Sequence, residues 1–419
     1  MKLEDLYILY SKQTLVDTDT RNIREGSLFF ALKGENFNGN MFAEEALNKG
    51  AKYAIIDEIK YRTHPNTILV DDVLKTLQEL ANFHRKQLNI PIIALTGSNG
   101  KTTTKELISA VIAKRFETVS TQGNLNNHIG VPLTLLSILP TTEFAVVEMG
   151  ANHLKEIEFL CNIIEPNYGY ITNFGKAHLE GFGSFEAIIK GKSELFDFLR
   201  KYQGKAFVNS DDKIQLNQSA GIDQISFDQA SIKLIGVNPF VKVQFEQTDI
   251  ESNLIGEYNY TNVAAAICIG NYFKVPLIDI KSAIENYIPS NNRSQIIDKK
   301  NAKIILDAYN ANPTSMEAAL KNFKSIKGDR KIVFLGDMFE LGQDSAVEHQ
   351  KIAELATSFD FETVYLIGKA FSITGVKNAF LYDSFESFKK STNSIDLAHA
   401  TILIKGSRGM ALERILDLF

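Results

Sequence analysis

One segment constrains the fold more than any other. Apolar residues at 90–95 run directly into Gly97-Ser98-Asn99-Gly100-Lys101-Thr102-Thr103, and a helical pattern with one apolar face follows at 104–116. A strand, a glycine turn and a helix in this order form a phosphate-binding loop, because backbone N–H groups and the helix N-terminus hold phosphate oxygens. Further strand candidates at 144–149, 168–172 and 206–209 alternate with helical segments, and this alternation predicts a parallel sheet covered by helices, an α/β fold.

The side chains of this loop predict a nucleotide and a metal ion. Gly97, Asn99 and Gly100 would shape the turn, Lys101 would reach the terminal phosphates, and the Thr102 hydroxyl would hold Mg²⁺ beside Thr103. The full Walker pattern has a glycine at the position of Leu95, so this is a variant loop. A glycine turn without a nucleotide is the alternative.

The chain has 419 residues, and a domain has roughly 150, so the length predicts about three domains. We expect a small α/β domain at 1–88, a central α/β domain with a parallel sheet at 89–294, and a Rossmann-like α/β domain at 295–419. The region 225–247 interrupts the alternation of strands and helices and predicts extended, antiparallel strands. Pro289 and the polar run 290–294 mark the expected hinge before the third domain.

Charge and cysteine content narrow the class of protein. The net charge is −5, from 45 basic and 50 acidic residues, which argues against a nucleic-acid coat or a membrane-surface protein. The two cysteines, Cys161 and Cys268, lie in apolar segments and indicate buried thiols of a reduced protein. Glu4 and Asp5 are unlike a signal peptide, and no apolar run reaches the roughly 18 residues of a membrane span. We therefore expect a soluble cytoplasmic protein without nucleic-acid partners.

Two polar side chains follow predicted strands and are candidate metal ligands. Glu148 ends the apolar run 144–149, and a carboxylate at that end of a parallel strand, beside a phosphate loop, suits Mg²⁺. A helix cap or an ion pair is the alternative for Glu148. His178 follows the predicted strand 168–172 and is either a metal ligand or an ordinary loop histidine.

Lys192 lies in the middle of the apolar stripe of a predicted helix at 184–199, whereas Lys190 points to the other side. A bare buried ammonium is costly, so Lys192 must extend to solvent, find a partner or change its chemistry. Extension to solvent is one interpretation. The other is carbamylation by CO₂, which would convert the cation into an anion able to bind Mg²⁺.

Polar residues also gather in three loops that suit a ligand with many donors and acceptors, although asparagines commonly form turns. These residues are Asn124, Asn126 and Asn127 in the first loop, Asp307, Asn310 and Asn312 in the second, and Lys405 and Arg408 in the third.

Taken together, these segments resemble the Mur ligase family over essentially the whole chain. The phosphate loop alone indicates only the superfamily, which includes folylpolyglutamate synthetase. DAYNANPTSM (307–316), LGDMFELG (335–342) and IKGSRGM (404–410) point to the members that add D-alanyl-D-alanine. The other matching segments are TDTR (18–21), LFFALKGENFNG (28–39), GNLNNHIGVPLTLL (123–136), VVEMGAN (146–152) and TNFGKAHLEGFGS (172–184).

The resemblance implies an ATP-dependent ligase of peptidoglycan precursor synthesis, and hence of cell-wall growth, cell shape and division. ATP would phosphorylate the terminal carboxylate of UDP-N-acetylmuramoyl-tripeptide, and the amine of D-Ala-D-Ala would attack the acyl phosphate. The implied domains are a UDP-binding, an ATP-binding and a Rossmann-like domain. The implied cofactors are ATP, two Mg²⁺ ions and a carbamylated Lys192. We expect the protein to be a monomer.

The resemblance also assigns roles to residues. Lys101 would contact the ATP phosphates, Thr102 and Glu148 the first Mg²⁺, and His178 and carbamylated Lys192 the second. Nucleotide contacts would come from Asn262, Arg293 and Asp307; uridine contacts from Thr20, Arg21 and Lys33; muramoyl-peptide contacts from Asn126 and Asn127.

Two alternatives remain at this stage. One is another Mur ligase or a folylpolyglutamate synthetase-like amide ligase, which would need a different acceptor pocket in the third domain. The other is an ATP-binding homologue without catalysis, and the presence of Lys101, Glu148, His178 and Lys192 argues against it.

Overall fold

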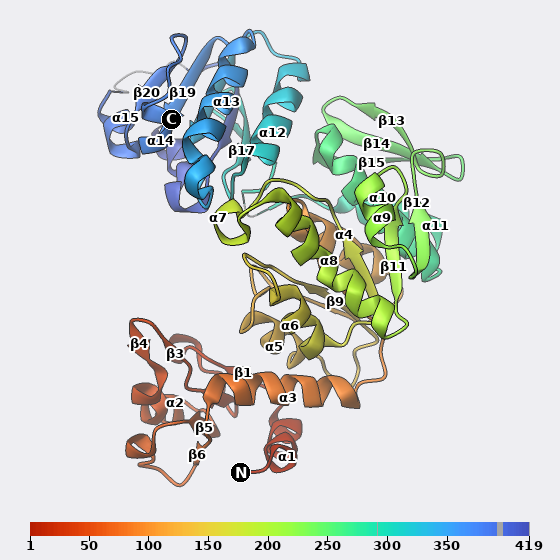
Figure 1. The fold of residues 1–419 in the computed structure, drawn as a ribbon, viewed down its shortest axis with the longest axis vertical. Coiled ribbons are helices and arrows are strands. Elements are labelled where there is room, and N and C mark those ends of the chain that lie inside the picture. The colour runs from red at the N-terminus through yellow and green to blue at the C-terminus, as the bar shows by residue number, and fades with distance from the viewer. Residues whose placement is uncertain (291, 392–396, 419) are drawn as a thin grey trace.

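The computed structural model describes residues 1–290, 292–391 and 397–418, so residue 291 of the expected hinge lies outside the described residues. Three α/β units follow one another along the long axis of the molecule (Figure 1). The N-terminal unit lies at one end, the C-terminal unit at the other, and the central unit between them. The three-domain α/β fold expected from the sequence is therefore confirmed.

The N-terminal unit is built on a four-stranded parallel sheet of order β1-β2-β5-β6. Its last helix, α3 (Val73–Gln87), is capped by Asp72, whose carboxylate accepts a hydrogen bond from the Lys75 N–H. This helix packs against the central unit. The other elements are α1 (Leu3–Gln13), β1 (Val16–Asp17), β2 (Leu28–Phe30), the β3 (Lys33–Gly34) and β4 (Phe37–Asn38) hairpin, α2 (Ala43–Asn48), β5 (Tyr53–Ile56) and β6 (Thr67–Leu69).

The central unit contains a six-stranded, fully parallel sheet of order β12-β11-β10-β7-β9-β8. Both faces are covered, so its middle strands are continuously apolar. Ile92 and Ala94 of β7 (Ile92–Thr96) join one core with α6 and α8, while Ile93 and Leu95 join a second core with α4 and α10. The elements are α4 (Lys101–Ile112), β8 (Thr118–Ser120), α5 (Gly130–Leu135), β9 (Phe144–Glu148), α6 (Glu156–Ile164), β10 (Tyr168–Ile171), α7 (Leu179–Phe182), α8 (Phe185–Lys201), β11 (Lys205–Asn209), α9 (Lys213–Gln218) and β12 (Asp223–Phe227).

A three-stranded antiparallel sheet follows, formed by β13 (Lys233–Val237), β14 (Phe240–Phe245) and β15 (Thr248–Ile255). The antiparallel strands expected at 225–247 therefore exist, but they begin later in the chain. Residues 225–227 belong instead to β12, which pairs in parallel with β11 and extends the main sheet. Helices α10 (Tyr260–Tyr272) and α11 (Leu277–Asn286) then return to pack on α4.

The C-terminal unit has a six-stranded sheet of order β16-β17-β21-β18-β19-β20, in which only the edge strand β16 is antiparallel. Its elements are β16 (Gln295–Lys299), β17 (Ala302–Asp307), α12 (Pro313–Ser325), β18 (Lys331–Gly336), α13 (Ser345–Ser358), β19 (Thr363–Ile367), α14 (Lys369–Ser372), β20 (Phe380–Tyr382), α15 (Phe385–Ser391) and β21 (Thr401–Lys405). Among the described helices, none is long and apolar enough to cross a membrane.

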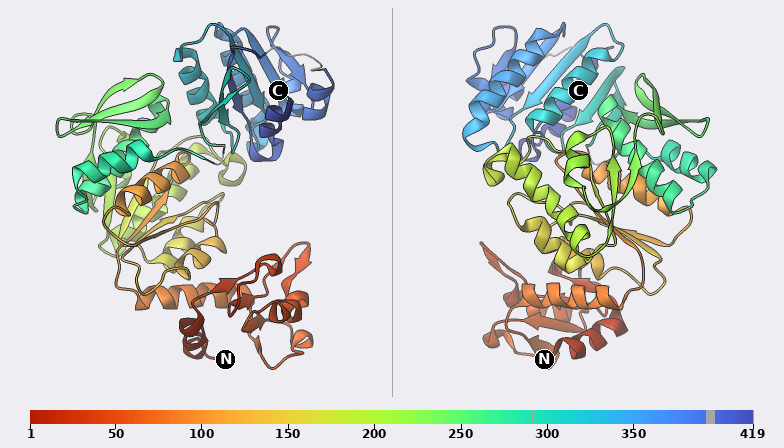
Figure 2. Two further views of the ribbon diagram at one scale, coloured as in Figure 1. Left: turned by 180° about the vertical axis from the view of Figure 1, so that it is seen from behind. Right: turned by 45° about the vertical axis from the view of Figure 1, so that its right-hand side comes forward.

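The central and C-terminal units face each other across a gap at which α7 lies (Figures 1 and 2). Loops that follow β7, β9 and β10 reach this gap from the central sheet, and loops that follow β17, β18 and β21 reach it from the C-terminal sheet. Open α/β sheets bind ligands at the carboxyl ends of their strands. Two such edges therefore meet at one place.

Candidate active site

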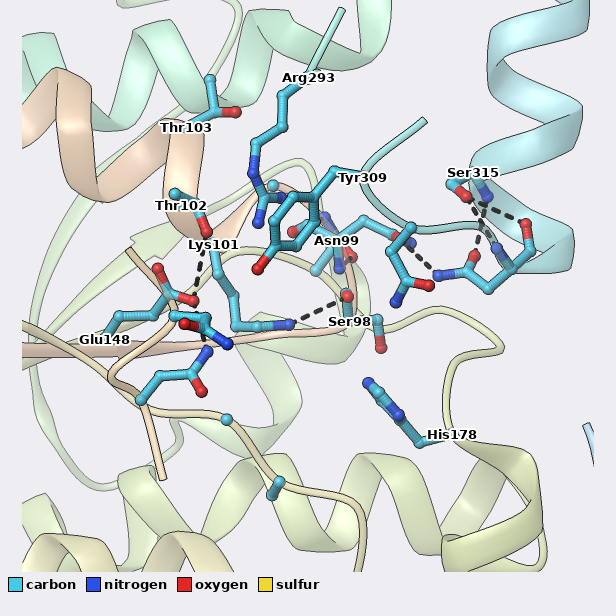
Figure 3. Close-up of a pocket in the computed structure, with 18 of the residues that line it drawn as sticks. Ser98, Asn99, Lys101, Thr102, Thr103, Glu148, His178, Arg293, Tyr309 and Ser315 are labelled. Carbon is cyan, nitrogen blue, oxygen red and sulfur yellow. Dashed lines mark hydrogen bonds between the residues drawn. The ribbon is translucent and has the colours of Figure 1, made fainter. Parts of the chain in front are cut away.

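A cavity of about 670 Å³ lies where the two sheet edges meet. The central unit contributes the phosphate loop with Glu148 and His178, and the C-terminal unit contributes Asp307 and Tyr309 (Figure 3). The predicted residues that line the cavity are Asn99, Gly100, Lys101, Thr102, Thr103, Asn124, Asn126, Asn127, Glu148, His178, Asn262, Arg293, Asp307, Asn310, Asn312 and Lys405.

The phosphate loop is held by the two residues that directly follow β10. Gly97 has φ +146°, and a Cβ at this position would collide with the Thr172 hydroxyl, so only glycine fits. The Thr172 hydroxyl donates to the Asn99 carbonyl at 2.6 Å, and the Asn99 N–H donates to Asn173 Oδ1 at 3.0 Å. Gly97 itself does not line the cavity. Its role is to let the chain turn.

Lys101 is folded back onto the loop that it follows. Its Nζ donates to the carbonyls of Gly97 at 2.7 Å and Ser98 at 3.2 Å (Figure 3). Burial lowers the pKa of Lys101, and the nearby Glu148 carboxylate partly opposes that shift. The two carbonyl partners are neutral, and an anionic phosphate would be a stronger hydrogen-bond partner for Nζ.

Glu148 ends β9 and is 1% exposed. Its Oε1 accepts hydrogen bonds from Asn126 Nδ2 at 2.8 Å and from the Thr102 hydroxyl at 3.3 Å. Its Oε2 is buried without a hydrogen-bond partner. An orphaned carboxylate oxygen beside a threonine hydroxyl fits a divalent cation, because both are hard oxygen ligands.

His178 faces the cavity and contacts the opposite unit. Its Nδ1 lies 2.5 Å from Glu340 Oε2, on the loop after β18. The imidazole is the main cause that lowers the pKa of Glu340. His178 is therefore placed between the two walls of the site rather than on a free loop surface.

Lys192 is 1% exposed, as its place on the apolar stripe predicted, while Lys190 is exposed. The Nζ donates to the Ala151 carbonyl at 3.0 Å and lies 5.2 Å from the centre of the Phe182 ring. Burial, with a further contribution from Lys101, lowers the pKa of Lys192 well below its usual range. Extension to solvent is excluded in this conformation. Lys192 lies behind Ala151 and does not itself line the cavity.

On the C-terminal wall, Lys405 is engaged by its own unit. Its Nζ lies 2.6 Å from Asp307 Oδ2 and 3.3 Å from the Asn310 carbonyl. Arg293 stacks on Tyr309, with 3.6 Å between the guanidinium carbon and the ring centre, and its Nε is buried without a partner. The stacking orients the Arg293 guanidinium, and its Nε remains available to a ligand.

Two asparagines connect the phosphate loop with more distant segments. Asn262 of α10 lies beneath Gly100, where its Oδ1 accepts from the Thr104 hydroxyl at 2.9 Å. Asn312 caps α12 and donates from Nδ2 to Asn99 Oδ1 at 2.7 Å. The second contact joins the two walls of the cavity directly.

Four residues predicted to bind the substrates do not line the cavity. One is exposed on the C-terminal unit, and three belong to the N-terminal unit. Arg408 is exposed and lies 3.7 Å from Glu413. The other three belong to the N-terminal unit: Thr20, whose carbonyl accepts from Lys49; Arg21, which pairs with Asp19 at 2.6 Å; and Lys33, which pairs with Asp57 at 3.0 Å.

The sequence interpretation did not single out Asn173, Tyr309 or Glu340 as site residues, although all three line the cavity. Each of the three follows a predicted strand and lies inside or beside a polar motif. This position could have identified them as site residues, because the loops after parallel strands meet at the ligand-binding edge of the sheet.

Comparison with known families covers most of the chain in three parts. Residues 12–88 match the catalytic domain of the Mur ligase family, residues 95–270 the Mur ligase middle domain, and residues 292–408 the Mur ligase glutamate ligase domain.

Curated relatives match over nearly the full length. The UDP-N-acetylmuramoyl-tripeptide–D-alanyl-D-alanine ligase of Bacillus subtilis is 34% identical, covering 96% of this chain and 92% of the relative. The enzyme of the same name from Escherichia coli is 33% identical with the same coverage. The crystal structure of MurF from Thermotoga maritima in complex with ADP has a TM-score of 0.85 at 26% identity, covering 98% of this chain and 97% of that one. MurF from Acinetobacter baumannii has a TM-score of 0.84 at 29% identity, covering 96% and 92%. The relatives match over nearly the full length, and the cavity between the two sheets contains the phosphate loop. The chain therefore belongs to the Mur ligase family.

Proposed function

We propose that this chain is an ATP-dependent ligase that joins D-alanyl-D-alanine to UDP-N-acetylmuramoyl-tripeptide in peptidoglycan precursor synthesis. The observation that carries the proposal is the cavity between the two sheet edges, in a chain whose full-length relatives bear that activity in their names. One wall carries a phosphate loop, and the other carries cationic and amide side chains that suit a second, polar reactant.

ATP binds at the phosphate loop. Lys101 exchanges its carbonyl partners, Gly97 and Ser98, for phosphate oxygens, which are stronger partners because they are charged. Arg293 contributes its unpartnered Nε, Asp307 holds the ribose, and Asn262 contacts the adenine. Because these groups come from both walls, a bound nucleotide would hold the two units together.

Two Mg²⁺ ions complete the site in our proposal. Thr102 and the free Oε2 of Glu148 hold the first ion. When bound, Mg²⁺ neutralises the repulsion between the substrate carboxylate and the ATP phosphates.

His178 and a carbamylated Lys192 hold the second ion. The lowered pKa of Lys192 favours its neutral amine, and a neutral Nζ attacks CO₂, loses one proton and becomes an anionic carbamate. The carbamate extends the side chain past Ala151, whose carbonyl already contacts Nζ and which lines the cavity.

Thr20, Arg21 and Lys33 bind the uridine nucleotide in the N-terminal unit, and Asn126 and Asn127 lie on the path of the muramoyl peptide. The peptide carboxylate attacks the γ-phosphorus and ADP leaves. The amine of D-Ala-D-Ala then attacks the acyl carbon, a proton is lost and phosphate leaves. Asn310, Lys405 and Arg408 line the approach of the dipeptide.

We further propose domain limits of 1–88, 89–294 and 295–419, a monomeric state and a cytoplasmic location. The three matched family regions support the limits. The free thiols of Cys161 and Cys268 are consistent with a reducing compartment.

The test is phosphate release from ATP and Mg²⁺ with UDP-N-acetylmuramoyl-tripeptide, with and without D-Ala-D-Ala. We expect release that requires both substrates, together with a pentapeptide product detected by mass. Release with a single amino acid or glutamate, but with no dipeptide, would assign another ligase activity. ATP binding without release under any condition would indicate a non-catalytic homologue.

A further inference from the structure

Two loops from different units interlock beside the cavity. The loop after β10 carries His178, and the loop after β18 carries Glu340. The Glu180 N–H donates to the Glu340 carbonyl at 3.0 Å, while His178 Nδ1 lies 2.5 Å from Glu340 Oε2. Backbone and side chain of Glu340 thus both face the central unit.

The backbone at both ends of this contact is in the left-handed region. His178 has φ +55° and Glu340 has φ +61°, although neither is glycine. Such conformations cost about 1 kcal/mol or more each and persist only where surrounding contacts impose them. The carbonyl of His178 accepts from the N–H groups of Gly181 and Phe182, which supplies part of that restraint. The geometry of the pair is therefore imposed by the fold rather than by chance contact of mobile side chains.

A second ion pair joins the same two units nearby. Lys176 Nζ lies 2.9 Å from Glu348 Oε1, and the Lys176 N–H donates to the Thr314 hydroxyl at 3.0 Å. Docking of the loop after β10 therefore does not rest on Glu340 alone. The Glu348 carboxylate provides a matched control, because it crosses the same interface and does not touch His178.

The contact to Nδ1 determines what the other ring nitrogen can do. The Glu340 carboxylate lies 2.5 Å from Nδ1 but is not aligned with it as a hydrogen bond in this conformation. A negative charge this close to Nδ1 favours the proton on that nitrogen, which leaves the lone pair of Nε2 free. Metal-bound histidines commonly have such a carboxylate on the nitrogen away from the metal, where it fixes both tautomer and ring orientation. His178 lines the cavity, and its side chain is 20% exposed.

We propose that Glu340 is a positioning residue that holds His178 from across the domain interface and presents its Nε2 to the cavity. The histidine side of the metal site is then complete only while the C-terminal unit is docked. This inference rests on the proposed role of His178 as a Mg²⁺ ligand, and Glu340 acts through His178 rather than on the substrates.

The first experiment reads the ring nitrogens of His178 by NMR in the full-length protein without nucleotide, metal or peptide. The chain has seven histidines, so a His178→Asn variant identifies the signals. We expect the Nδ1–H tautomer in the wild type, a shift toward the Nε2–H tautomer in Glu340→Ala, and no change in Glu348→Ala. An unchanged tautomer in Glu340→Ala would overturn the proposal.

The second experiment measures Mn²⁺ affinity by electron paramagnetic resonance in the presence of ADP. Loss of such a supporting carboxylate weakens metal binding roughly 10- to 100-fold, so we expect that range for Glu340→Ala. Glu340→Gln retains an acceptor for Nδ1–H and should restore most of the affinity, and it remains informative if the alanine variant does not fold. Glu348→Ala should bind as the wild type does. Unchanged or tighter binding in Glu340→Ala, or an equal loss in Glu348→Ala, would contradict the proposal.

The two experiments separate this inference from the proposed function. Neither requires turnover, so a failed ligase assay with the expected tautomer and Mn²⁺ results would leave the role of Glu340 intact. A successful ligase assay with an unchanged His178 tautomer would retain the function and remove the inference.

Discussion

Asp307 and Lys405 are register partners at the ends of neighbouring parallel strands, β17 and β21, and their side chains form a buried ion pair of 2.6 Å. The Lys405 side chain is only 3% exposed, so its charge is committed to Asp307 and to the Asn310 carbonyl. This wall of the cavity is therefore shaped before any ligand arrives.

Removal of one partner of this pair should cost more than removal of both. We expect Lys405→Met to lower the free energy of unfolding by about 3 kcal/mol, because the Asp307 carboxylate is left without its cation. The double variant Lys405→Met/Asp307→Asn should recover part of that loss in urea denaturation. Strict additivity of the two single changes would contradict coupling between them.

Lys101→Ala should reduce ADP formation by about 100- to 1,000-fold, the range for loss of one group that stabilises transition-state charge. The Nζ donates to two backbone carbonyls of its own loop, Gly97 and Ser98, so we expect the fold to persist. Initial rates of ADP formation provide the measurement, and circular dichroism provides the control for folding. Undiminished turnover would contradict the phosphate role of Lys101.

Lys192→Ala should be inactive and should regain activity with added short-chain carboxylic acids, which replace the missing carbamate. The same helix offers a control, since Lys190 is exposed and Lys190→Ala should behave as the wild type does. Wild-type activity should also rise with bicarbonate after CO₂ has been removed. Absence of rescue, together with an unmodified lysine in the mass spectrum of the intact native protein, would exclude carbamylation.

His84 should make the protein less stable in acid. Its Nε2 donates to the Ile138 carbonyl at 3.0 Å, and its Nδ1 lies 3.2 Å from the Tyr7 hydroxyl, which can donate to it when the ring is neutral. Burial lowers the pKa of His84, whereas the unfolded chain titrates at about 6.5. As the pH falls below about 6.5, the unfolded state binds a proton at His84 that the folded state does not bind. The free energy of unfolding then falls by at most about 1.4 kcal/mol per pH unit.

Urea denaturation between pH 7.5 and 5.5 tests this expectation for His84, with the range chosen around the pKa of about 6.5 for an unfolded histidine. His84→Gln should have a flatter dependence on pH than the wild type. His153, whose side chain is 65% exposed, provides the matched control, and His153→Gln should leave the slope unchanged. Equal slopes in all three proteins would show that His84 does not contribute.

The sequence predicted the fold class because its strands are buried on both faces and hence continuously apolar, as Ile92 to Leu95 illustrate. Helical periodicity also placed Lys192 among apolar neighbours, but it left open whether the amine reaches solvent, and the structure shows that the side chain is buried. Residues 225–227 were expected to be antiparallel but pair in parallel with β11, because pairing partners depend on topology and not on local pattern.

The phosphate loop was recognisable because its chemistry is local, and Glu148 because it follows a strand of the same sheet. Contacts between units were not recognisable in this way. The Glu340 contact with His178 joins positions far apart in the chain, and the Lys405 contact with Asp307 depends on which strands are neighbours. No local spacing encodes either contact.

The cavity has walls from two separate sheets, and this has a consequence for inhibition. A compound need not resemble ATP or a muramoyl peptide to stop such an enzyme. A rigid inhibitor bound between the Asn99 and Asn312 side chains, which are hydrogen-bonded across the cavity, would hold the two walls apart while leaving the phosphate loop intact. Mutations that confer resistance to such an inhibitor would have to change an interface that the enzyme also needs for every turnover.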